Sequence, residues 1–130
     1  MKLLLDTHVM LWWLRDNPKL GPLARTAIAD PRSTLLVSIA SFWELSIKVR
    51  VGKFDESAAR LFAESIEEAF QIIGVEQSHL AALEGLRRLP DHNDPFDHLI
   101  LAQANAEDAT IITNDKAMTL YGVPCIPARR

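Results

Sequence analysis

The chain alternates short, continuous apolar runs with longer segments of helical periodicity, and this alternation constrains its fold more than any other feature. An apolar run without polar alternation is typical of a strand that is buried on both faces, as in a parallel sheet. Strands are expected at residues 3–5, 34–38, 71–75, 110–113 and 123–126. Strands that alternate with helices predict an α/β fold, with a parallel sheet covered by helices on both faces.

Helical segments separate these strands, and capping residues, prolines and Gly52 mark several of their ends. We expect helices at residues 7–15, 22–29, 39–51, 57–70, 77–89, 94–108 and 116–121. The sequence contains no internal repeat, low-complexity tract or linker. Residues 1–130 are therefore interpreted as a single domain.

Composition argues against several classes of protein. The formal net charge of −3 argues against a strongly basic nucleic-acid coat, although it leaves room for a local basic rim. Cys125 is the single cysteine, so there is no internal disulfide framework and a reducing, cytoplasmic compartment is expected. The first apolar run ends at Asp6, too early for a signal peptide. No segment approaches the length of a transmembrane helix, so no membrane association is expected.

Isolated acidic residues stand at the ends of expected strands and near the starts of expected helices. Asp6 ends the first apolar run, and Asp115 follows the fourth. Asp94 and Asp97 open an apolar helix, and Glu44 lies within another. Sites in parallel sheets form at the carboxyl ends of strands, so these acids are expected at one edge. Gathered carboxylates repel one another unless a cation joins them, and Mg²⁺ and Mn²⁺ prefer oxygen ligands. The set therefore predicts a hard-cation site suited to phosphodiester chemistry.

Most of these acids also have a purely structural interpretation. Asp6 and Asp115 fit N-caps of the helices that follow them, which would satisfy free backbone N–H groups. Asp94 fits an N-cap before Pro95, and this interpretation is the preferred one for Asp94. Negative charge in the first helical turn is also favoured at Asp97. The apolar neighbours of Asp97 nevertheless indicate a buried helix, so its carboxylate must face a polar group.

Glu44 can be explained by an exposed ion pair with Lys48, one helical turn away. Against this, the neighbouring Phe42 and Trp43 suggest a helix that is packed on several sides. A carboxylate there costs free energy unless it is paired or bound to a metal. Both interpretations stay open at the level of the sequence.

Other residues with possible chemistry give weaker signals. The four histidines show no metal-ligand spacing, and ordinary loop or helix-surface roles are expected for His92 and His98. Core packing is the default interpretation of the three tryptophans. Adjacent Trp12 and Trp13 cannot both face the same way, so one of them is expected in an interface.

Four short motifs follow one another along nearly the whole chain. They are Leu3-Leu4-Leu5-Asp6-Thr7-His8, Phe42-Trp43-Glu44 within residues 38–53, Asp94-Pro95-Phe96-Asp97 before the apolar residues 99–104, and Thr113-Asn114-Asp115. Together they resemble the PIN-domain ribonucleases, in particular the VapC toxins of bacterial toxin–antitoxin pairs. One departure is His98, where the branch of the family with this third motif more often has arginine.

The resemblance implies a three-layer α/β/α sandwich around a parallel sheet. The family's four-acid catalytic and metal-binding site is matched by Asp6, Glu44, Asp97 and Asp115. Asp94 matches a residue specific to that branch and is a further candidate metal ligand. The implied protein is a homodimeric endoribonuclease that cleaves RNA with Mg²⁺ or Mn²⁺ and is silenced by a small cognate antitoxin.

Three other functions compete with this one. The first is a catalytically silent PIN domain that binds RNA or acts as a scaffold. Loss of one of the four acids would favour it, and all four are present. A magnesium-dependent phosphatase of the haloacid dehalogenase type also places an aspartate after the first strand. That class requires the pattern D-x-D, and here the third position is His8. A receiver-type signalling domain requires an acidic pair near the first strand and a lysine after the last, and neither is clear.

Overall fold

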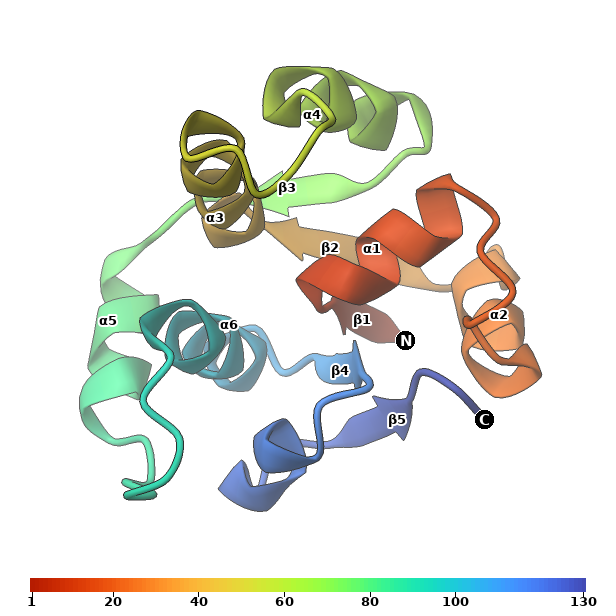
Figure 1. The fold of residues 1–130 in the computed structure, drawn as a ribbon. Helices are drawn as coiled ribbons and strands as arrows, with labels where there is room; N and C mark the ends of the chain where they lie inside the picture. Colours follow the sequence, from red (N-terminus) through yellow and green to blue (C-terminus); the bar gives the residue numbers. More distant parts are fainter.

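Five parallel strands form the centre of the molecule, as a computed structural model of all 130 residues shows. The strands are β1 (Lys2–Leu5), β2 (Thr34–Ser38), β3 (Gln71–Ile73), β4 (Thr110–Thr113) and β5 (Cys125–Pro127). Their order in the sheet is β3-β2-β1-β4-β5, so β1 lies at the centre (Figure 1). The predicted parallel sheet is confirmed, and the predicted bounds of the second and fourth strands agree with those of β2 and β4.

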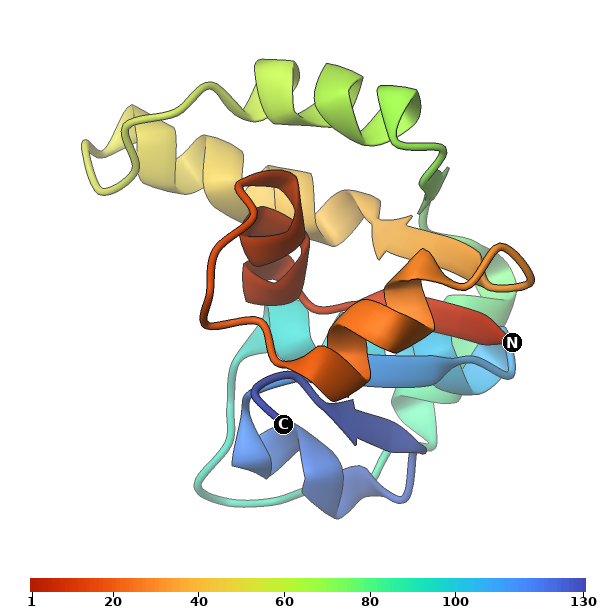
Figure 2. The same ribbon diagram turned by 90° about the vertical axis from the view of Figure 1, so that its right-hand side faces the viewer.

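Helices cover both faces of this sheet (Figures 1 and 2). They are α1 (Thr7–Leu14), α2 (Pro22–Ala29), α3 (Ile39–Arg50), α4 (Ala58–Glu67), α5 (Gln77–Glu84), α6 (Pro95–Ala106) and the 3₁₀ helix η1 (Lys116–Tyr121). One apolar cluster packs the helices α1, α2, α3 and α4 against one face of the sheet. A second cluster packs α6 and η1 against the other face. The three-layer α/β/α sandwich is therefore confirmed. No helix has the length and apolar character that crossing a membrane requires.

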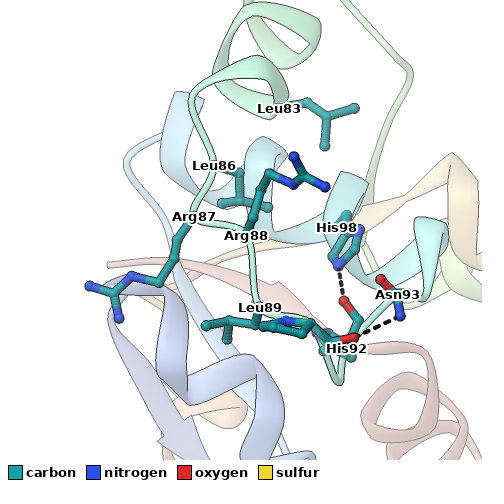
Figure 3. A pocket seen from close by; sticks show the side chains of 9 residues that line it. Leu83, Leu86, Arg87, Arg88, Leu89, His92, Asn93 and His98 are labelled. Carbon is teal, nitrogen blue, oxygen red and sulfur yellow. Dashed lines mark hydrogen bonds between the residues drawn. The ribbon is translucent and has the colours of Figure 1, made fainter.

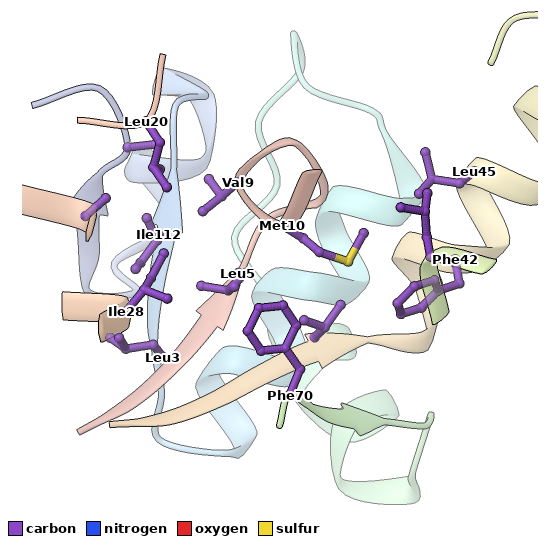
Figure 4. Packing of buried hydrophobic residues seen from close by; sticks show 14 of the residues in the cluster. Leu3, Leu5, Val9, Met10, Leu20, Ile28, Phe42, Leu45, Phe70 and Ile112 are labelled. Carbon is purple, nitrogen blue, oxygen red and sulfur yellow. The ribbon is translucent and has the colours of Figure 1, made fainter. Parts of the chain in front are cut away.

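Alternate side chains of β1 supply the two apolar clusters. Leu3 and Leu5 point into the first cluster and Leu4 into the second, and all three are fully buried. Figure 4 shows the first cluster, in which Ile112 lies beside Ile28 of α2 and Val9 of α1, while Phe42 and Leu45 of α3 extend the cluster away from β4. Because both faces of the strand are buried here, residues 3–5 of β1 are continuously apolar rather than alternating.

The chain adds its strands outward from β1 in two directions. It proceeds from β1 to β2 and β3 on one side, and then returns to place β4 and β5 on the other. The order of strands therefore reverses between β1 and β4. In open α/β sheets, ligands bind outside the carboxyl ends of the strands at such a switch point.

Helix α5 ends five residues earlier than the sequence predicts. The prediction extended to residue 89, whereas the helix ends at Glu84 with Gly85 as its C-cap. The backbone N–H of Leu86 donates to the carbonyl of Leu83, a tight closing turn. Residues 85–94 consequently form a connecting loop between α5 and α6, although their apolar spacing resembles a further helical turn.

Helix α4 also ends earlier than predicted, because the chain turns through a left-handed residue. Ala69 has φ of 61°. Its N–H donates to the carbonyl of Ile66, and the N–H of Phe70 donates to that of Ser65. These two bonds define a Schellman motif, in which the left-handed position is usually glycine. The turn directs the buried Phe70 into the core and starts β3.

Candidate metal centre at the carboxyl edge of the sheet

Asp6 and Asp115 lie at the switch point, one residue beyond the end of β1 and two residues beyond the end of β4, which is its neighbour. Asp6 is the N-cap of α1, and its Oδ1 accepts from the N–H of Thr7 at 2.8 Å. Its Oδ2 accepts from the Thr113 hydroxyl at 2.7 Å, and that hydroxyl oxygen accepts from the Asp115 N–H at 3.0 Å. Thr113 thus connects the two acids and fixes their separation. Asp115 also caps η1, through the N–H of Ala117 at 2.9 Å.

Asp94 and Asp97 occupy the first turn of α6. Asp94 Oδ1 accepts from the N–H groups of Phe96, at 2.9 Å, and of Asp97, at 3.3 Å. The capping role expected for Asp94 is therefore present, and Pro95 follows it at the first helical position. Asp97 makes no capping bond with its side chain. Its Oδ2 instead lies 2.9 Å from Nε2 of His92, a contact that capping cannot explain.

His92 has a role that the sequence analysis missed. Its ring is half-buried in the loop before α6 and lies between Asp97 and Tyr121. Nε2 faces a carboxylate that can only accept, so in the neutral ring Nε2 donates and Nδ1 accepts from the Tyr121 hydroxyl at 2.7 Å. His92 thereby orients Asp97. The available signal was the position of His92 two residues before Asp94, but its partner Tyr121 is distant in sequence.

Glu44 lies on the second turn of α3, and both interpretations given above are partly right. Its carboxylate is 3.8 Å from the Lys48 ammonium, and 18% of the side chain is exposed. The helix is not packed on several sides as expected, because Trp43 is 61% exposed whereas Phe42 is buried. Glu44 lies between these two faces and points toward the other acids.

All five predicted acids line one depression of about 380 Å³ at the carboxyl edge of the sheet. The remaining lining residues are polar as well: His8, Lys48 and Asn114. Five carboxylates therefore face one ammonium group and no hydrophobic side chain. The acids come from four segments, namely the ends of β1 and β4, the second turn of α3 and the first turn of α6.

Burial and mutual repulsion raise the pKa of three of these carboxyl groups. The pKa of Asp97 is raised to about 6, chiefly by desolvation and then by Asp94, Asp6 and Asp115, against the opposing hydrogen bond from His92. The pKa of Asp6 is raised by desolvation and, less strongly, by Asp115. Desolvation also raises the pKa of Glu44. The ionised cluster is thus unfavourable without a cation.

The donor set fits a hard divalent cation. Mg²⁺ and Mn²⁺ take carboxylate oxygens, and several uncompensated carboxylates in one depression supply both ligands and charge. One group of possible ligand atoms lies within 4.8 Å of one another, on Asp97, Asp115 and His92. Nε2 of His92 already donates to Asp97. Oxygen atoms are therefore the available ligands.

An all-parallel α/β/α sandwich with clustered acids at its switch point is the arrangement expected of a PIN-like domain. Residues 3–123 match the family model of the PIN domain, and the chain belongs to that family. The resemblance inferred from the four motifs is confirmed at this level. No curated protein matches the chain.

Solved structures with the same fold include several toxin–antitoxin complexes. The VapBC2 complex of Rickettsia felis, bound to a DNA fragment from its promoter, contains a chain with 16% identity and a TM-score of 0.72, and the match covers 97% of this chain and 98% of that one. VapBC-1 of nontypeable Haemophilus influenzae gives 18% identity and a TM-score of 0.69, with both chains covered completely. A toxin–antitoxin complex of Klebsiella pneumoniae contains a chain with 19% identity and a TM-score of 0.66, and the match covers 97% of each chain. At these identities the likeness is one of fold.

Proposed function

We propose that this protein is a metal-dependent endoribonuclease that acts as the toxin of a toxin–antitoxin pair. The observation that carries the proposal is the convergence of five carboxylates from four segments on one hydrophilic depression. Membership of the PIN domain family and the resemblance of the motifs to VapC toxins support it. The matching fold of chains from toxin–antitoxin complexes supports the toxin role.

In this proposal Asp6, Glu44, Asp97 and Asp115 hold Mg²⁺ or Mn²⁺ and are the catalytic acids. Asp94 is a further candidate ligand, through the oxygen that does not cap α6. A bound cation supplies charge neutralisation at the phosphodiester and lowers the pKa of a water molecule. The reaction is hydrolysis, in which a water oxygen bonds to phosphorus while the bond to the leaving ribose oxygen breaks. Water loses one proton, and the leaving oxygen gains one.

The protein's contribution is to hold the acids in place before substrate arrives. Asp6 is fixed by Thr7 and Thr113, and Asp97 is fixed by His92. Asp6 and Asp97 thus each have a hydrogen-bonded support, the arrangement that typically maintains metal affinity, whereas Glu44 has only the ion pair with Lys48. Thr7 also donates to the Ser41 hydroxyl at 2.8 Å, which joins α1 to α3 near Glu44.

Cleavage of single-stranded RNA tests the nuclease. We expect cleavage with Mg²⁺ or Mn²⁺ and none in EDTA. Asp6→Asn and Asp97→Asn should each reduce the rate by at least about 100-fold, because each removes a ligand charge with little change of shape. Asp55→Asn, a matched change at an exposed acid away from the depression, should retain wild-type activity. Equal rates with and without EDTA would refute metal dependence.

Growth and co-purification test the toxin role. Expression of the wild-type chain should arrest growth, whereas Asp97→Asn should be harmless. Co-expression with a small adjacent reading frame should restore growth and yield a complex without nuclease activity. A wild-type chain that cleaves RNA but never slows growth and binds no neighbouring product would separate the nuclease from the toxin.

Helix α3 offers the surface that we propose for this partner. Trp43, Ile47 and Val51 stand one turn apart and are 61%, 41% and 60% exposed. Trp12 and Trp13, of which one is expected in an interface, are both partly buried against the first apolar cluster. An apolar helix of the antitoxin would cover the α3 stripe, and an arginine from it would pair with the adjacent carboxylates. Ile47→Asp should then weaken the complex while nuclease activity is retained.

A further inference from the structure

A second pocket, of about 440 Å³, lies beside the acidic depression and has the opposite chemistry. It forms where the loop of residues 85–94 passes over α6 (Figure 3). Leu83, Leu86 and Leu89 line it together with Pro90 and provide an apolar wall. Its polar lining consists of two arginines, two histidines and Asn93, with no carboxylate. We name this the basic pocket.

The two arginines of the basic pocket are not equivalent. Arg87 donates to the Leu120 carbonyl at 3.0 Å, and Figure 3 shows its guanidinium directed away from the other lining side chains. Arg88 makes no hydrogen bond or ion pair, and in Figure 3 it extends alongside Leu83 and His98. Arg88 therefore presents an uncommitted, permanently charged group beside an apolar surface. Such a group suits a phosphate, which its planar fork can bind with two hydrogen bonds.

The basic pocket and the acidic depression share the first turn of α6. His92 lines the pocket and bonds to Asp97, which lines the depression. Asn93 and His98 line the pocket, each next in sequence to an acid of the depression. An RNA strand with one phosphate at the carboxylates would therefore place the neighbouring nucleotide at the basic pocket.

Polar groups of the pocket remain available to a ligand. Asn93 donates through Nδ2 to the Pro90 carbonyl at 3.0 Å, which leaves its Oδ1 free to accept. His98 donates through Nε2 to the His92 carbonyl at 2.8 Å, which leaves its Nδ1 free. Unpaired bases in RNA complexes stack on side-chain planes such as histidine and arginine and are read through hydrogen bonds along their edges.

We propose that the basic pocket binds the unpaired nucleotide of the RNA substrate that adjoins the scissile phosphodiester. Arg88 binds a phosphate of that nucleotide, while the leucine wall and His98 receive its base. Asn93 Oδ1 accepts from an exocyclic amino group. This inference rests on the proposed ribonuclease function and adds the residues that select and position the substrate.

Binding in EDTA tests the proposal without cleavage. A short labelled single-stranded RNA should bind the Arg88→Gln variant about tenfold more weakly than wild type, with the salt dependence reduced by about one phosphate contact. Arg87→Gln is the matched control and should change the affinity less than about twofold, because Arg87 already bonds within the protein. An abasic ribose next to the cleavage position should weaken wild-type binding. Equal losses for the two arginine variants would overturn the proposal.

Cleavage kinetics separate this proposal from the function on which it rests. With Mn²⁺ present, Arg88→Gln should raise KM and leave kcat close to wild type, since Arg88 contributes binding and not chemistry. Wild-type protein that neither binds nor cleaves RNA would refute the proposed function itself. Cleavage by wild type with an unchanged KM in Arg88→Gln would refute the basic pocket alone. If Arg88→Gln loses affinity for the antitoxin but keeps its affinity for RNA, the basic pocket binds a protein partner instead, and the proposal is refuted.

Discussion

The raised pKa of Asp97 predicts that replacing this residue stabilises the metal-free protein. The native pKa is about 6, against an ordinary value of 3.8. At about 1.4 kcal/mol for each pKa unit, the difference corresponds to an upper limit of ~3 kcal/mol. Water at the mouth of the depression screens part of this repulsion, so we expect a gain of about 1–2 kcal/mol for Asp97→Asn above pH 7. The new amide oxygen can still accept from His92, so the fold is retained.

The sign of the pH dependence follows from proton binding. Between pH 4 and pH 6 the native carboxyl group holds a proton that the unfolded chain has released. Wild-type stability from this group therefore falls as pH rises through about 6 and is lowest above it. The advantage of Asp97→Asn should accordingly be largest near pH 8 and shrink toward pH 4.

Urea denaturation in EDTA across this pH range measures the difference. Asp55→Asn, at an exposed acid away from the depression, is the control and should follow the wild-type curve at every pH. If Asp97→Asn is less stable than wild type at pH 8, or if its difference from wild type does not change with pH, then the depression is not electrostatically strained. The argument for a cation site would lose its energetic basis.

Three further predictions concern metal, turn and assembly. Millimolar Mn²⁺ should raise the melting temperature of wild type and raise that of Asp97→Asn much less, and an unmoved wild-type melt would contradict a clustered site. Ala69→Gly should stabilise the fold by about 1 kcal/mol in urea denaturation, because φ of 61° suits glycine. Ala63→Gly, at an exposed position inside α4, should instead cost about 1 kcal/mol. Sedimentation at micromolar concentration should give twice the chain mass of 14.6 kDa, and a monomer would refute the expected dimer.

Much of the fold could be predicted because the strands are buried on both faces. The continuous apolar runs of β2 and β4 lie between polar or turn residues, so their bounds follow from hydrophobicity alone. The sequence predicts the last strand at residues 123–126, whereas it lies at Cys125–Pro127, because prolines and an edge position weaken the pattern. The end of α5 was wrong because Leu86 and Leu89 continue its apolar spacing but pack from a loop.

Less of the site could be predicted, because it depends on contacts between distant residues. The acids were identifiable as isolated carboxylates at strand and helix ends. The hydrogen bonds that orient them were not, since Thr113 meets Asp6 and Tyr121 meets His92 only after the sheet forms. Likewise the exposure of Trp43 depends on how α3 packs, and an apolar sequence alone does not distinguish a core from a surface stripe.

The position of β1 in the sheet also determines which pairings must form before the acidic depression is complete. Strands β1, β2 and β3 belong to the first 73 residues and pair with each other in sequence order. Pairing of β4 with β1 closes a much longer loop, and Asp6 and Thr113 are 107 residues apart. Contacts of such high contact order form slowly, because the entropy of loop closure opposes them. A chain in which β4 is not yet paired with β1 would hold Asp6 and Glu44 without Asp115, so the proposed hydrolysis requires this long-range pairing.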